Sequence, residues 1–242
     1  YTHLFHAFVQ PRNRTGNNLW QTNEDFWDDH YTLWDSWKTL FPLMCIIDQE
    51  MVASNIRSFI NRYRHNKYVT TAFVNGKESA VGQGGNTVDN IIGDAFVKNI
   101  PGVDWEEAYK ILKYNADSMR SPGYRAIGYM YNGEPTGYSW RMKSGSGTIA
   151  FSFNDYCIAT IAKGLGKEED SKLYINRSLN WKNVWNYKAT SEGYKGFIMA
   201  RNRDGSFNEI DPKGGYNRHF YEGTCWEYSY ELPHNVEEMV KL

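Results

Sequence analysis

The sequence predicts an all-α fold built from helical hairpins. Several segments of the 242-residue chain repeat apolar residues at the three- and four-residue spacing of a helix, and no segment alternates apolar and polar residues convincingly over more than a few positions. The predicted helices follow one another in pairs that turn-rich loops separate. Hairpins in this order can close into a ring, whose centre is a natural polar and aromatic pocket.

The first two predicted helices differ in their surroundings. Residues 28–47 are aromatic and apolar on more than one face, which is typical of a buried helix, and Pro42 should kink or end it. Residues 50–64 carry apolar side chains at helical spacing, so they are predicted to form an amphipathic helix.

The next pair of helices has recognisable starts. Asn86 or Thr87 can cap a helix over residues 88–98. Asp104, with a glutamate three residues later, has the pattern of a capping box before a helix over residues 105–119.

The second half of the chain alternates loops and helices. Residues 121–147 are rich in Gly, Ser and Tyr and are predicted to be a long loop, a kind of segment that often serves a site. Residues 148–165 form a strongly apolar helix, and residues 168–185 are long enough to pair with it as an antiparallel hairpin. Residues 193–215 again have the composition of a loop, and residues 235–242 begin another helix.

Composition excludes some partners. The net charge is −1, with 27 basic and 28 acidic residues, and no basic stripe indicates nucleic acid. No apolar run approaches the ~20 residues of a membrane span. Aromatic residues make up 16% of the chain, which favours a ligand that stacks on rings. Because the sequence begins with Tyr1 rather than Met, we expect the natural N-terminus to lie upstream, so a missing signal peptide says nothing about export.

The three cysteines are predicted to be buried free thiols. Cys45, Cys157 and Cys225 have no metal-type spacing, and the first two lie in apolar helical segments. Cys225 alone has a second interpretation as a catalytic thiol, with His219 or His234 as its base.

Two aromatic and acidic segments are typical of a sugar site. Residues 221–229 read YEGTCWEYS, with Pro233 and His234 close behind, and residues 27–37 read WDDHYTLWDSW. Aromatic rings cover the apolar faces of a pyranose, and a shielded glutamic acid keeps the proton that a leaving glycosidic oxygen needs. The alternative is that the tryptophans fill a core and the acids cap helices.

The order and spacing of these motifs resemble glycoside hydrolase family 92, the calcium-dependent exo-acting α-mannosidases. The resemblance runs over essentially all 242 residues. It rests on the following segments, in order: Leu4-Phe5-His6-Ala7, Trp34-Asp35-Ser36, Gln83-Gly84-Gly85, Asp94-Ala95-Phe96-Val97-Lys98, Asn154-Asp155-Tyr156, Ala162-Lys163-Gly164-Leu165-Gly166-Lys167, Arg203-Asp204-Gly205-Ser206-Phe207, Tyr221-Glu222-Gly223, Trp226-Glu227-Tyr228-Ser229 and Pro233-His234.

The resemblance implies that residues 1–242 are part of a catalytic toroid of six helical hairpins. The family's N-terminal β-sandwich and the C-terminal part of the toroid would lie outside this sequence, together with the motifs that supply the general base and most calcium ligands. Calcium is therefore the expected cofactor, with no complete metal site expected here. Two departures stand in the tail: Thr224 replaces a common Asn, and Glu227 stands where many members have Gln.

The implied reaction is hydrolysis of a terminal α-mannosyl bond, α-1,2-linked, with inversion of configuration. The resemblance assigns the general acid to Glu222, and flanking rings at Tyr221 and Trp226 are expected to keep water from it. Glu227 is a second candidate for the acid, and otherwise a polar contact. The remaining predicted substrate contacts are Trp34, Asp35, Gln83, Trp226 and His234.

Mannose-containing glycans are the expected partners, and the secretory pathway or the extracellular space is the expected location. Sequons at Asn13 and Asn176 permit glycosylation there, although chance explains them equally well. Three alternatives stay open: a glycan-binding module without a base, another toroid enzyme such as a polysaccharide lyase, and a helical scaffold for protein partners.

Overall fold

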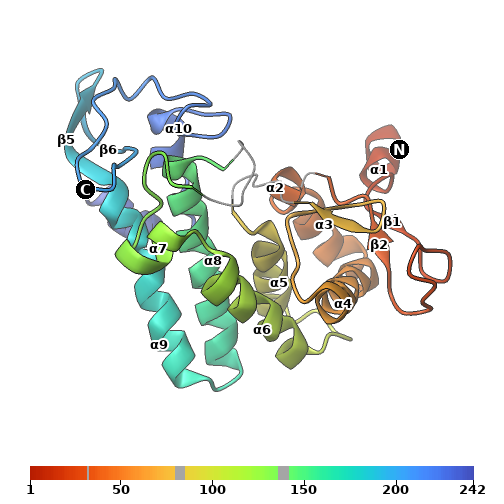
Figure 1. Cartoon of the computed structure of the whole chain (residues 1–242). Helices are drawn as coiled ribbons and strands as arrows, with labels where there is room; N and C mark the ends of the chain where they lie inside the picture. Colours follow the sequence, from red (N-terminus) through yellow and green to blue (C-terminus); the bar gives the residue numbers. More distant parts are fainter. Residues whose placement is uncertain (32, 80–84, 136–141) are drawn as a thin grey trace.

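The computed structural model describes residues 1–31, 33–79, 85–135 and 142–242, and helices dominate it (Figure 1). The first half contains α1 (Thr2–Ala7), α2 (Leu33–Ser36), α3 (Leu40–Ile47), α4 (Gln49–Asn66), α5 (Thr87–Val97) and α6 (Trp105–Tyr114). The second half contains α7 (Pro122–Ile127), α8 (Ser144–Gly164), α9 (Glu168–Arg177), α10 (Cys225–Ser229) and α11 (Val236–Val240). A π-helical turn, η1 (Asn115–Met119), continues α6, and a 3-10 turn, η2 (Ser178–Val184), continues α9.

The chain is not purely α-helical, because the described residues also form three two-stranded antiparallel sheets. These pair β1 (Arg12–Asn13) with β2 (Trp27–Asp28), β3 (Ala72–Val74) with β4 (Lys77–Ser79), and β5 (Trp185–Ser191) with β6 (Tyr194–Ile198). Helices are therefore the main regular structure of the described residues, and the all-α description needs this correction.

The single buried helix predicted over residues 28–47 is wrong. Trp27–Asp28 forms strand β2, and His30 makes an isolated bridge to Phe73 before α2 and α3 begin. Main-chain pairing with neighbouring strands outweighs the helical pattern of the aromatic residues here. Pro42 does not break a helix, because it lies in the first turn of α3, where its missing N–H group has no intrahelical acceptor.

Helices α4, α5 and α6 confirm the helices that the spacing of apolar residues and the capping residues predicted. The Asp48 carboxylate accepts a hydrogen bond from the Met51 amide at 3.0 Å and caps α4. The Asp104 carboxylate accepts one from the Glu107 amide at 3.1 Å and caps α6 as predicted. Asn86 is the N-cap residue of α5, although its side chain makes no capping hydrogen bond.

The long loop predicted over residues 121–147 contains α7 and the first turn of α8. Ser121 caps α7, with Pro122 at its first position, which is a helix-start signal that the composition masked. The glycines at the start of α8 serve close packing rather than flexibility. A Cβ atom on Gly145 would lie 2.4 Å from the Phe220 ring, so only glycine fits this approach.

Helices α8 and α9 lie side by side as the predicted antiparallel hairpin (Figure 1). The helix predicted to reach residue 185 ends at Arg177, and the predicted loop at 193–215 contains strand β6. The hairpin turn between β5 and β6 is Glu192-Gly193, where both residues have positive φ, as a type I′ turn requires.

Two large hydrophobic clusters of the described residues hold most of these elements, and a small third one packs Tyr124 of α7 against Phe151 of α8. One large cluster joins α3, α4, α5, α6 and the second half of α8, and the other joins the start of α8 to η2, the β5–β6 hairpin and α10. Within the described ranges, no helix has the length and apolar character to cross a membrane.

Candidate active site

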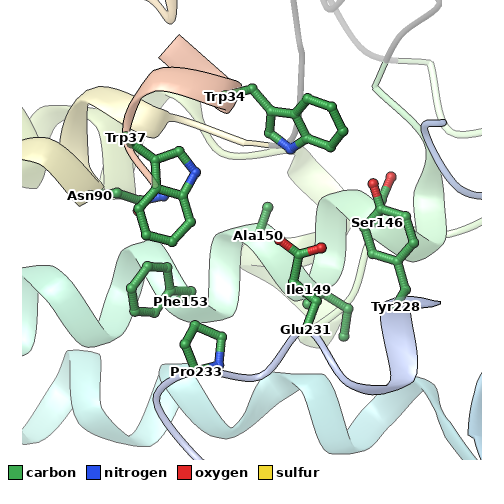
Figure 2. Close-up of a pocket in the computed structure, with 10 residues that line it drawn as sticks. All are labelled: Trp34, Trp37, Asn90, Ser146, Ile149, Ala150, Phe153, Tyr228, Glu231 and Pro233. Atoms are coloured by element: carbon green, nitrogen blue, oxygen red, sulfur yellow. The ribbon is translucent and has the colours of Figure 1, made fainter. Parts of the chain in front are cut away.

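A narrow pocket lies where α2, α5, α8 and the tail after Phe220 converge (Figure 2). Its volume is about 20 Å³, which is room for about one water molecule. The residues that line it are Trp34, Trp37, Asn90, Ser146, Ile149, Ala150, Phe153, Tyr228, Glu231 and Pro233. Aromatic walls with a carboxylate between them suit a sugar-binding surface, because rings pack on the apolar faces of a sugar and carboxylates accept hydrogen bonds from its hydroxyl groups.

The two segments that the sequence singled out meet at this pocket. The half-buried Trp34 ring packs edge-on against Tyr221, with 5.2 Å between the ring centroids. Partial burial raises the pKa of the Asp35 carboxyl group, and the negative charge of Glu222 raises it further. Asp35 and Glu222 are therefore electrostatic neighbours on the same side of the molecule.

Glu222 has an unusual backbone and an exposed side chain. Its φ is +48°, in the left-handed region that non-glycine residues seldom adopt, and such a conformation costs on the order of 1–3 kcal/mol. The prediction that Tyr221 and Trp226 shield it from water is wrong, because Glu222 is exposed. Tyr221 is turned inward and buried instead.

Several residues that line this pocket were not predicted as substrate contacts, among them Trp37, Tyr228 and Glu231. The Glu231 carboxylate points into the space that Trp34, Trp37 and Ala150 surround (Figure 2). It forms an ion pair with Lys38, whose ammonium group lies 5.2 Å from the centroid of the Trp37 ring. The sequence did carry a signal for Trp37. It stands three residues after Trp34, a spacing that places two side chains on one face of a helix.

Tyr228 is within electrostatic range of two carboxylates, those of Glu231 and Glu222. Burial raises the pKa of its hydroxyl group, and the charges of Glu231 and Glu222 add to that shift. Its hydroxyl group therefore stays protonated and acts as a hydrogen-bond donor.

Trp226 and Glu227 have other roles than the predicted substrate contacts. The Trp226 indole donates a hydrogen bond to Ser191 at 3.1 Å, and its ring packs on Phe197 of the β5–β6 hairpin with centroids 5.0 Å apart. Glu227 completes a capping box with Thr224 at the start of α10, and the hydrogen bond from the threonine hydroxyl lowers the pKa of Glu227. These contacts give both residues a structural role. Neither lines the pocket, and the same is true of Asp35 and Glu222, so the assignment of substrate contacts stays a prediction.

His234 is directed at the scaffold as well. Its Nε2 atom lies 3.0 Å from the Ser178 carbonyl oxygen, so the imidazole donates there, and its ring packs between Phe153 and Tyr156. Burial lowers its pKa, which favours the neutral ring. Gln83, the other predicted contact, lies outside the described residues.

The acidic residues Asp28 and Asp29 have partners of their own. Asp28 accepts hydrogen bonds from the Gly76 amide, and Asp29 pairs with Arg12. In the part of the chain that the structure describes, no group of three or more His, Cys, Asp or Glu residues is placed to hold a metal ion.

The cysteines confirm the prediction of buried free thiols. Burial raises the pKa of Cys225 to about 12, so a thiolate nucleophile is not available at neutral pH. The interpretation of Cys225 as a catalytic residue is therefore not supported.

A match to a family model decides the classification of the chain. The model of the glycosyl hydrolase family 92 catalytic domain matches residues 1–242. The chain belongs to this family. This membership confirms the resemblance drawn from the motifs, and it argues against both the polysaccharide lyase and the helical scaffold.

Relatives extend this assignment. An uncharacterized secreted glycosidase of Arthroderma benhamiae is 26% identical over 272 residues, which cover 99% of this chain and 31% of that protein. A family GH92 α-mannosidase of Bacteroides thetaiotaomicron, solved in complex with mannoimidazole, matches at 25% identity with a TM-score of 0.83 and covers 99% of this chain and 33% of its own.

A second solved protein of Bacteroides thetaiotaomicron, a family GH92 inverting mannosidase, matches with a TM-score of 0.81 at 19% identity. It covers 98% of this chain and 33% of its own, and at this identity it shows the fold alone. The chain spans about a third of the length of the relatives that it matches.

Proposed function

We propose that this chain forms part of the catalytic domain of an α-mannosidase that removes terminal mannose from glycans. Family membership supports glycoside hydrolysis, and the α-mannosidase at 25% identity supports mannose as the sugar. The observation that carries the proposal is the meeting of Trp34 and Asp35 with Tyr221 and Glu222. We further propose the α-1,2 linkage and inversion of configuration, which product analysis on linkage-defined substrates tests.

In this proposal Glu222 is the general acid. A bound sugar that stacks on Trp34 covers the exposed carboxyl group, so the substrate supplies the shielding that the protein's own rings do not. The Asp35 carboxylate accepts hydrogen bonds from neighbouring hydroxyl groups of the mannose. Inversion needs a second carboxyl group, roughly 6.5–9.5 Å from the acid, to activate water. We assign that base to a part of the family's catalytic domain outside these residues.

We also propose that the complete domain is an α/α toroid and that calcium is its cofactor. Both rest on the family resemblance. Loss of turnover when a chelator is added, and its recovery with added calcium, tests the cofactor. The name of the Arthroderma benhamiae relative supports a location outside the cell or in the secretory pathway, which recovery of the protein from culture medium tests.

The decisive experiment compares two substrates of the full-length protein. α-Mannobiose has a poor leaving group that needs protonation, whereas a dinitrophenyl α-mannoside leaves without it. Glu222→Gln should lower kcat/KM on the disaccharide by about 10²–10⁴-fold and on the activated substrate by far less. Glu209→Gln, at an exposed position away from the pocket, is the matched control.

Each contrary outcome has a defined meaning. If Glu227→Gln, rather than Glu222→Gln, loses far more activity on α-mannobiose than on the dinitrophenyl α-mannoside, the general acid is Glu227. Mannose binding by the full-length protein without any turnover would favour the alternative of a glycan-binding module.

A further inference from the structure

Side chains fix the backbone on both sides of the Glu222 peptide unit. The Tyr221 amide donates a hydrogen bond to the Ser146 hydroxyl at 3.2 Å, and the Tyr221 carbonyl oxygen accepts one from the Tyr228 hydroxyl at 2.6 Å. The Glu222 amide donates a hydrogen bond to the side-chain oxygen of Asn217 at 2.8 Å. Three consecutive main-chain polar groups therefore have side-chain partners rather than neighbours in a helix or strand.

These contacts stabilise a backbone conformation that is unfavourable for residues other than glycine. Glu222 has φ +48° and Asn217 has φ +51°, and left-handed non-glycine residues persist where the surroundings over-determine them. The Tyr228 ring also lies close to the turn, because a Cβ atom on Gly223 would lie 2.8 Å from it. Release of the turn toward the β region would redirect the carboxylate of Glu222.

Two of the three partners come from helices. Ser146 lies in the first turn of α8, and the Gly145 amide there donates to the His219 carbonyl oxygen at 3.0 Å, which ties the turn to this helix. Tyr228 is buried in α10. The direction of the Glu222 side chain is thus set by two helices and one asparagine.

We propose that Tyr228 and Asn217 are positioning residues, which lock the left-handed turn so that the Glu222 carboxyl group faces the Trp34 and Asp35 side of the pocket. This inference rests on the proposed function, because it takes Glu222 as the acid. Neither residue exchanges a proton with the substrate. Both act through the backbone that presents the acid.

The test of Tyr228 uses the same pair of substrates on the full-length enzyme. Tyr228→Phe removes the hydrogen bond to the Tyr221 carbonyl oxygen but keeps the ring. We expect kcat/KM on α-mannobiose to fall by about 10–100-fold, in line with the cost of a 1 Å misplacement. On the dinitrophenyl mannoside it should fall by less than about 2-fold, because that leaving group needs no acid. Tyr230→Phe, two residues further at an exposed position, is the matched control.

Asn217→Gly gives an independent test. Glycine keeps the left-handed backbone but removes the side-chain acceptor, so a selective loss on α-mannobiose isolates the hydrogen bond. Asn99→Gly is the matched control, because Asn99 also has positive φ, at +55°, and lies elsewhere.

The outcomes separate this inference from the proposed function. If Glu222→Gln loses activity equally on the two substrates, or loses none, both the proposed function of Glu222 and the positioning role are overturned. The positioning role alone is overturned by a different pattern. Glu222→Gln then loses far more activity on α-mannobiose than on the dinitrophenyl mannoside, whereas Tyr228→Phe and Asn217→Gly lose activity equally on both substrates or not at all. If Tyr228→Phe fails to fold, Asn217→Gly decides the question.

Discussion

Glu78→Gln should be among the most destabilising single substitutions of a polar residue in this chain. Arg62 of α4 is fully buried, and its guanidinium group forms a bidentate pair with Glu78 of β4 at 2.8 and 2.7 Å. The same carboxylate accepts hydrogen bonds from the Thr70 amide at 2.8 Å and hydroxyl at 2.7 Å. The pair therefore attaches the β3–β4 hairpin to α4.

The expected magnitude follows from burial. The amide of glutamine removes the negative charge and leaves the Arg62 cation buried without a counter-charge, which costs about 3–5 kcal/mol. The Arg62 guanidinium lies 4.4 Å from the centroid of the Phe73 ring, a contact that recovers only a small part of this. Since a typical domain is stable by about 5–15 kcal/mol, the loss should be obvious in an unfolding experiment.

Urea unfolding followed by tryptophan fluorescence measures the effect. With an m-value of about 3 kcal/mol/M, the midpoint should fall by about 1–1.7 M. Glu50→Gln is the matched control. Glu50 also pairs with an arginine, Arg57, at 2.5 Å, but its side chain is 74% exposed, so its loss should cost about 0–1 kcal/mol.

A double variant tests the reason for the loss. Arg62→Met combined with Glu78→Gln should restore part of the stability, because no unpaired charge then remains. Equal losses in Glu78→Gln and Glu50→Gln, within about 0.5 kcal/mol, would refute the reasoning.

Three further predictions concern the site and the core. Glu222→Gln should shift the titration of Asp35 to lower pH, because a nearby negative charge that raises its pKa is removed, and NMR of the labelled carboxyl groups measures this. Burial lowers the pKa of His30 to about 3, so as the pH falls below about 6.5 the unfolded chain binds a proton that the folded chain does not bind. Relative to His30→Gln, the wild type should therefore lose about 2 kcal/mol of unfolding free energy between pH 7 and pH 5, as measured by urea unfolding. A difference between the two proteins that does not change with pH would contradict this. Gly145→Ala should cost about 1–3 kcal/mol because its Cβ atom meets the Phe220 ring, and an unchanged melting temperature would contradict this.

The sequence predicted the helices whose apolar faces repeat cleanly. Helices α4, α5, α6 and α8 followed from spacing, and the cap of α6 followed from Asp104. The failures lie where tertiary contacts override local preference. His30 pairs with Phe73 in a bridge, so the aromatic segment could not remain one helix. Strand β5 was missed because a register shift in its ladder blurs the alternation of buried and exposed side chains.

The site could be predicted only in part for a similar reason. Trp34, Asp35 and Glu222 belong to recognisable motifs, and the structure brings their two segments together. Trp226 stands in the same motif, but it lies in the first turn of the short helix α10, which directs its ring to the β5–β6 hairpin. Motif membership identifies the segment, whereas the direction of each side chain depends on the backbone, as the left-handed turn at Glu222 illustrates.

The ion pair between Lys38 and Glu231 joins residues 193 positions apart in the chain. A ribosome that adds about 5–20 residues per second needs about 10–40 s to make the stretch between them. During that interval the indole rings of Trp34 and Trp37 have emerged without the tail that completes their pocket, and a nascent chain in this state offers other proteins two uncovered aromatic surfaces. The pocket between α2 and α8 can therefore form only after the segment around Glu231 has been made.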